Sequence, residues 1–207
     1  LEPLVSAKAF SEQDPHSQRL MLANDHENFE ITIDHVRRAR QGYFANISYL
    51  DEKIGRIWDS LERCRMLDDT IIVLCGDHGD MLGERGLSFK MSFFEGSARV
   101  PLMIAAPDLS PSRITTPVSL MDIGATLLDL CGVVHADDVM PGDGRSLAPV
   151  AGGAARTAPV YMEYAAEGSY APLVSIRDGP WKFNFCELDP PQLFNLDADP
   201  SESLNLA

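Results

Sequence analysis

The most constraining feature of this chain is a continuous apolar run at residues 70–75 (TIIVLC), which ends abruptly in residues 76–80 (GDHGD). A short β-branched run without polar alternation is typical of a strand buried on both faces, as in a parallel sheet covered by helices. In open α/β sheets, ligands bind beyond the carboxyl ends of the strands. The sequence therefore predicts an α/β fold with a polar site directly after residue 75.

The flanking patterns predict helices, a second strand and then a small antiparallel sheet. Between residues 34 and 65, apolar residues recur every three or four positions, which indicates a long helix with one stripe facing a core. A short helix near 17–23, a strand at 100–105 and a helix at 119–130 are also expected. The last third predicts short strands at 160–164, 173–177, 181–186 and 192–196.

These elements suggest three parts. Residues 1–34 form an irregular polar segment, residues 35–150 belong to an α/β layer, and residues 151–207 form a small antiparallel subdomain. The loop-rich stretch near residues 150–158 is the expected boundary between the last two parts.

The net charge of -14 restricts the partners of the chain. Such a surface repels nucleic acid and anionic membranes. An enzyme that acts on anions would need positive charge concentrated in its site, which a metal ion can supply. The four cysteines form no C-x-x-C pair, and no segment resembles a signal peptide or a membrane span. We therefore expect reduced thiols and a cytoplasmic protein.

The residues after the strand are candidates for chemistry. Asp77 and His78 offer a hard oxygen and a borderline nitrogen to a divalent cation, although a solvated turn is the alternative interpretation. Lys90 follows among aromatic residues, where it either reaches along the surface to solvent or directs its charge at an anion. Among the other histidines, His16 and His26 lie in a polar segment that we place at the entrance of the site, without a chemical role.

Several blocks in order resemble the sulfatase family of the alkaline-phosphatase superfamily. They are residues 76–84 (GDHGDMLGE), Lys90, residues 94–102 (FEGSARVPL), residues 121–130 (MDIGATLLDL) and residues 192–196 (QLFNL). Four further stretches are most similar to the choline-sulfatase subgroup: residues 12–20 (EQDPHSQRL), 43–51 (YFANISYLD), 90–99 (KMSFFEGSAR) and 162–168 (MEYAAEG). The resemblance implies an alkaline-phosphatase-like fold, with this chain contributing the later part of the central mixed sheet.

The resemblance also implies a mechanism. Asp77 and His78 would bind a divalent cation, most often Ca²⁺ in this family and sometimes Mn²⁺ or Mg²⁺, and Lys90 would contact the sulfate and the leaving oxygen. The nucleophile of the family is a formylglycine made from a Cys or Ser in a C/S-x-P-x-R motif, and no cysteine of this chain has that context. We therefore expect the nucleophile upstream of Leu1, a chain that is inactive alone, and a homo-oligomer at full length.

The resemblance to the choline-sulfatase subgroup implies choline sulfate as the substrate. A quaternary ammonium group binds aromatic faces and nearby carboxylates, and Glu163 and Glu167 lie beside tyrosines in the sequence. A strand edge and a solvated loop are the alternative interpretation of this stretch. Two other functions remain open: a phosphonate monoester or phosphodiester hydrolase of the same superfamily, and a non-catalytic chain with a structural or assembly role.

Overall fold

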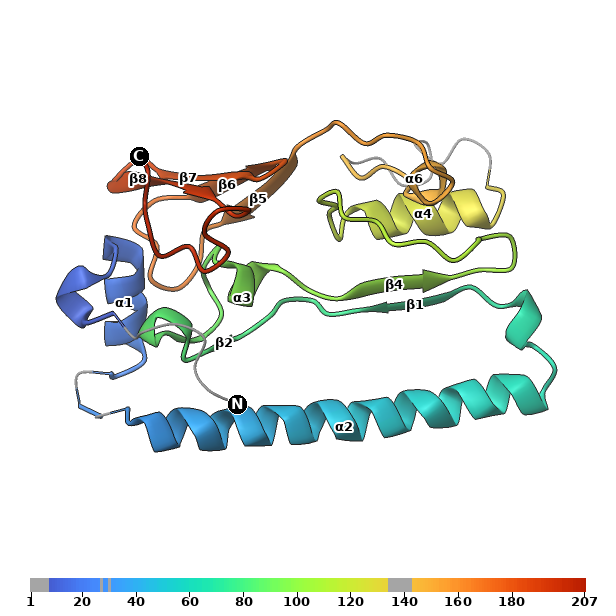
Figure 1. Ribbon diagram of the computed structural model, residues 1–207, viewed down its shortest axis with the longest axis horizontal. Helices are drawn as coiled ribbons and strands as arrows, with labels where there is room; N and C mark the ends of the chain where they lie inside the picture. The colour runs from blue at the N-terminus through green and yellow to red at the C-terminus, as the bar shows by residue number, and fades with distance from the viewer. Residues whose placement is uncertain (1–7, 27, 30, 134–142) are drawn as a thin grey trace. The chain divides into compact units, whose positions relative to one another are not determined.

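The computed structural model describes residues 8–26, 28–29, 31–133 and 143–207, and these residues form two compact units (Figure 1). Among the described residues, the first unit comprises those up to residue 55 together with 78–100 and 161–207, and the second comprises residues 56–77 and those described between 101 and 160. The three-part division predicted from the sequence stays a prediction, and residues 1–7, 27 and 30 of its first part and residues 134–142 of its second lie outside the described residues. No helix among the described residues is long and apolar enough to cross a membrane.

The second unit contains the strand that the sequence singled out. Strand β1 (Ile72–Cys75) pairs with β4 (Leu102–Ala105) in antiparallel register, with Ile72 opposite Ala105. The expectation of a parallel neighbour was wrong for this pair, and the first three residues of β1 are half-buried. In the part of the chain that the structure describes, β1 has only β4 beside it. The apolar run therefore predicts a strand correctly but not the direction of its partner.

A buried carboxylate organises the helical part of the same unit. Helix α4 (Asp122–Leu130) begins where Ser119 N–H donates to the carboxylate of Asp122 at 2.8 Å, which is one of the two hydrogen bonds of a capping box. Asp122 is 1% exposed, pairs with Arg156 at 3.0 Å and accepts a hydrogen bond from Arg145 N–H. These contacts hold the chain that leads into the short helix α6 (Ala148–Ala151) against the start of α4.

Helix α2 (Ile33–Arg63) confirms the long predicted helix. Its apolar stripe is exposed in the described residues, with Ile47, Leu50 and Trp58 each more than 40% accessible. The 3.6-residue period identified the helix correctly, whereas the expected burial of the stripe is absent from the described part of the chain.

The first unit begins with the short elements η1 (Phe10–Glu12) and α1 (Pro15–Ala23). Two short strands, β2 (Met81–Leu82) and β3 (Ser88–Phe89), pair around η3 (Glu84–Gly86), and α3 (Glu95–Ala98) follows. The remaining short element, η2 (Leu67–Asp69), precedes β1 in the other unit.

The four strands predicted near the C-terminus are present. They form one sheet in the order β5-β6-β7-β8, from β5 (Val160–Tyr164), β6 (Leu173–Asp178), β7 (Trp181–Cys186) and β8 (Asp189–Asn195) (Figure 1). β7 is antiparallel to both of its neighbours. Gly179 has φ 51°, a left-handed conformation that suits glycine in the tight turn between β6 and β7.

A buried ionic network fixes this sheet to α3. Lys182 on β7 is fully buried, and its ammonium group contacts Glu202 at 2.5 Å, Glu95 at 2.9 Å and the carbonyl oxygen of Phe93 at 2.6 Å. Burial raises the pKa of Glu202, although Lys182 opposes this shift. The alternating pattern of β7 predicts which face of the strand is buried. That a lysine lies on this face is explained only by the acidic and carbonyl partners that the structure places around it.

Candidate active site around Lys90

The backbone on both sides of Lys90 adopts a conformation that is rare for residues other than glycine. Phe89 has φ 69° and Met91 has φ 77°. Such left-handed residues cost on the order of 1–3 kcal/mol each and persist where surrounding contacts enforce them, often at functional sites. The Lys90 side chain between them is exposed.

Lys90 and His78 meet in the folded chain. Lys90 Nζ lies 2.9 Å from His78 Nε2, and His78 Nδ1 lies 2.9 Å from the carbonyl oxygen of Gly79. An ammonium group only donates and a carbonyl oxygen only accepts, so Nε2 must be the acceptor and Nδ1 must carry the proton. In this arrangement the lone pair on His78 Nε2 faces the lysine.

This tautomer suits a metal ligand. Histidines that bind metals commonly donate their other ring N–H to a carbonyl or carboxylate oxygen, which orients the ring. Binding of a cation at Nε2 would require Lys90 to leave its present hydrogen bond. Among the described residues, no three or more His, Cys, Asp or Glu side chains are grouped so that they could hold a metal ion. The described residues therefore fit part of a metal site.

Gly79 holds the His78 loop close to its neighbours. Gly79 N–H donates to Ser97 O at 2.8 Å. A Cβ atom at this position would lie 2.2 Å from the carbonyl oxygen of Gly96. Only glycine permits this approach, so the loop geometry around His78 depends on it.

Asp77 lies immediately after β1 and is exposed, as is His78. The boundary between the two compact units falls between these residues. The proposal that Asp77 and His78 bind the same cation therefore rests on the fact that they are consecutive in the sequence.

The two acidic candidates differ in their surroundings. The Tyr164 hydroxyl donates to the Glu167 carboxylate at 3.0 Å. A hydrogen bond from its own backbone, the Tyr164 hydroxyl and the charge of Lys90 all lower the pKa of Glu167. Burial, followed by this contact, raises the pKa of Tyr164 to about 12. Glu163 is exposed on β5. Because successive side chains of a strand point to opposite faces, Glu163 points away from the face on which Met162 and Tyr164 pack against a hydrophobic core cluster.

His16, for which the sequence suggested no chemical role, is buried beside this group. It is 6% exposed, and its ring nitrogens lie 2.7 Å from Met91 O and 3.2 Å from Gly168 O. Its ring also meets the Tyr164 ring edge-on at 5.9 Å. Its position in a polar stretch gave no sign of these contacts, because both acceptors are backbone atoms distant in sequence.

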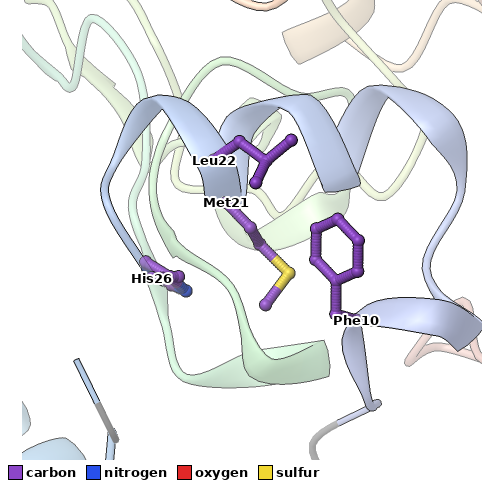
Figure 2. Close-up of a pocket in the computed structure, with 4 residues that line it drawn as sticks. All are labelled: Phe10, Met21, Leu22 and His26. Carbon is purple, nitrogen blue, oxygen red and sulfur yellow. The ribbon is translucent and has the colours of Figure 1, made fainter. Parts of the chain in front are cut away.

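A separate small cavity of about 160 Å³ is lined by Phe10, Met21, Leu22 and His26 (Figure 2). Its lining is mainly apolar, and burial lowers the pKa of His26. The candidate residues described above do not line it.

Two family models match the chain. The model described as "Sulfatase" matches residues 3–133, and the model described as "N-sulphoglucosamine sulphohydrolase, C-terminal" matches residues 83–207. Together they extend over almost the whole sequence.

Curated relatives carry sulfatase names. The chain is 61% identical over 208 residues to the choline-sulfatase of Rhizobium meliloti (strain 1021), a match that covers 100% of this chain and 40% of that protein. It is 34% identical over 188 residues to arylsulfatase K of Danio rerio, covering 86% of this chain and 35% of that protein. The chain thus spans less than half the length of these relatives.

Solved structures agree on the fold. A phosphonate monoester hydrolase of Agrobacterium radiobacter matches with a TM-score of 0.74 and 29% identity, over 85% of this chain and 38% of that one. A putative sulfatase from Bacteroides thetaiotaomicron matches with a TM-score of 0.81 and 21% identity, over 97% of this chain and 46% of that one. The predicted sulfatase fold of the alkaline-phosphatase type is confirmed.

Proposed function

Since this chain belongs to the sulfatase family, we propose that its protein is a sulfuric ester hydrolase that cleaves choline sulfate to choline and sulfate. The similarity to a choline-sulfatase over the whole chain supports the substrate. The observation that carries the proposal is the contact between two exposed residues, in which Lys90 Nζ lies 2.9 Å from His78 Nε2.

In this proposal Lys90 binds the sulfate end of the substrate. Its ammonium group would offset negative charge that builds up on the leaving oxygen during S–O cleavage. The left-handed residues on both sides hold the base of its side chain, while the tip remains exposed and able to move. Its present acceptor, His78 Nε2, shows that the tip can be placed beside the proposed metal ligand.

We propose Asp77 and His78 as ligands of a divalent cation, with Ca²⁺ preferred and Mn²⁺ or Mg²⁺ as alternatives. Such an ion would supply concentrated positive charge next to the sulfate, in a chain whose net charge is -14. The formylglycine nucleophile belongs to a motif that this sequence does not contain, and no role in nucleophilic attack is assigned to any residue here.

Glu167 would bind the choline end. A carboxylate held by a tyrosine hydroxyl offers a fixed negative charge to a trimethylammonium group, and aromatic rings beside it add cation–π attraction. The fixed rotamer of Glu167 and the ring of Tyr164 fit this role. Glu163 remains a weaker proposal, because it is exposed on β5 and faces away from the side of Tyr164.

A phosphonate monoester hydrolase is the second candidate. The similarity to the Agrobacterium radiobacter enzyme supports it, and the chemistry of Lys90 and a divalent cation suits both phosphoryl and sulfuryl oxygens. We further propose a homo-oligomer in the cytoplasm.

Turnover of three esters by the full-length protein tests these alternatives. We expect choline sulfate to be hydrolysed with a higher kcat/KM than 4-nitrophenyl sulfate or phenyl phosphonate. Glu167→Gln should raise KM for choline sulfate and leave 4-nitrophenyl sulfate almost unchanged, because only the first substrate carries a cation. Glu187→Gln, at an exposed position in the turn after β7, is the matched control.

Preferred hydrolysis of phenyl phosphonate would favour the second candidate. An unchanged KM for choline sulfate in Glu167→Gln would remove that residue from the substrate site.

A further inference from the structure

His16 contacts the two loops that carry the proposed substrate-binding charges, in each case at the residue that follows the charged one. Met91, whose carbonyl oxygen lies 2.7 Å from His16 Nε2, follows Lys90. Gly168, whose carbonyl oxygen lies 3.2 Å from His16 Nδ1, follows Glu167. One buried ring thus links the backbones of both loops.

Both linked residues have unusual backbone conformations. Met91 and Gly168 each have φ 77°. A Cβ atom at Gly168 would lie 2.8 Å from Leu20 and 3.6 Å from His16, so this loop packs tightly on α1. Because carbonyl oxygens only accept hydrogen bonds, a ring nitrogen must carry a proton to bond either of them, and a neutral imidazole offers one such N–H; the contact of Nε2 with Met91 O, at 2.7 Å, is the shorter of the two.

The helix that carries His16 is itself anchored. Asp14 caps α1 by accepting a hydrogen bond from Ser17 N–H at 3.0 Å. Arg19 donates to Gly168 O at 2.5 Å and forms a two-pronged ion pair with Asp189 on β8. The ring of His16 therefore projects from a fixed base.

We propose that His16 is a positioning residue that sets the distance between Lys90 and Glu167, and thereby the length of substrate that the site accepts. This inference rests on the proposed function, because it takes these two residues as the binding groups for the sulfate and the cation. His16 itself would touch neither end of the substrate. It would act through the backbone carbonyls at Met91 and Gly168.

The test compares choline sulfate with 4-nitrophenyl sulfate in full-length variants. His16→Ala should lower the ratio of their kcat/KM values by roughly 10- to 100-fold, since misplacement of about 1 Å can cost that much. His16→Gln, whose amide can still donate to one carbonyl, should give an intermediate ratio. His26→Gln, on the chain just beyond α1, is the matched control and should retain the wild-type ratio.

A double-mutant comparison separates positioning from general damage. In the Glu167→Gln background, His16→Ala should lower the ratio no further, because the group that it positions is already gone. A purely structural role would reduce the amount of active enzyme and lower kcat for both esters equally, which leaves the ratio unchanged and overturns the inference.

The substrate preference of the wild-type enzyme distinguishes a failure of the proposed function from a failure of the role of His16. If it shows no preference for choline sulfate, the proposed function fails and the role of His16 fails with it. If the preference is present and His16→Ala retains it, only the role of His16 is wrong.

Discussion

At the scale of single residues, the candidate site depends on backbone geometry as much as on charged groups. Lys90 is exposed but lies between two left-handed residues, and His78 is oriented by the carbonyl oxygen of its neighbour Gly79. The site is therefore sensitive to substitutions that alter loop geometry without removing any charge.

Gly79→Ala tests this sensitivity. The added Cβ would lie 2.2 Å from Gly96 O, so the loop must shift, and such overpacking costs about 1–3 kcal/mol. We expect a lower thermal midpoint and a loss of turnover in the full-length protein. The control is Gly55→Ala on α2, where no described atom lies within 4 Å and replacement stabilises a helix by about 0.5–1 kcal/mol. Equal behaviour of the two variants would contradict the close approach at Gly79.

The sequence predicted part of this site. Asp77, His78 and Lys90 were identified from residue types and family resemblance, and the contact between His78 and Lys90 supports their grouping. The contacts of His16 were not predicted, because a ring that meets two backbone carbonyls leaves no pattern in a single sequence. The left-handed conformations of Phe89 and Met91 could not be predicted from the sequence either, since neither residue type favours a positive φ.

At the scale of elements, local periodicity predicted helices and strands better than it predicted their partners. The long helix, the strand β1 and the four C-terminal strands lie where the sequence placed them, within a few residues. The antiparallel pairing of β1 with β4 and the exposure of the α2 stripe were not predicted. An apolar pattern indicates that a face is buried in the protein, but it does not indicate which segment packs against that face.

The attachment of α1 to β8 gives a pH-dependent prediction. The hydrogen bond from Arg19 lowers the pKa of Asp189 below its usual 3.8. A carboxylate with a lowered folded-state pKa binds fewer protons in the native than in the unfolded chain. Its contribution to stability is thus present above about pH 4 and is lost as the pH falls through the folded pKa.

Thermal midpoints of the full-length protein between pH 3 and 6 measure this contribution. Asp189→Asn should be less stable than wild type at pH 6, and the difference should shrink below pH 4. Asp178→Asn, at the exposed end of β6, is the control and should follow wild type throughout. A difference that stays constant with pH would show that the ion pair is not the cause.

At the scale of the whole molecule, the chain carries part of a sulfatase. It belongs to the family by two overlapping family models, and it spans 40% of the length of a choline-sulfatase to which it is 61% identical. The described residues group two candidate charges and one candidate metal ligand, whereas a complete metal site needs more ligands than they supply. We propose that Asp77 and His78 bind one cation and that Lys90 binds one sulfate group beside it.

Anomalous diffraction from crystals of the full-length protein with Mn²⁺ and inorganic sulfate tests that claim most directly. We predict a manganese peak within roughly 2–2.6 Å of His78 Nε2 and a carboxylate oxygen of Asp77. Lys90 Nζ should have moved from His78 to a sulfate oxygen. A manganese peak elsewhere, or a Lys90 side chain still hydrogen-bonded to His78 with both ligands bound, would contradict the account.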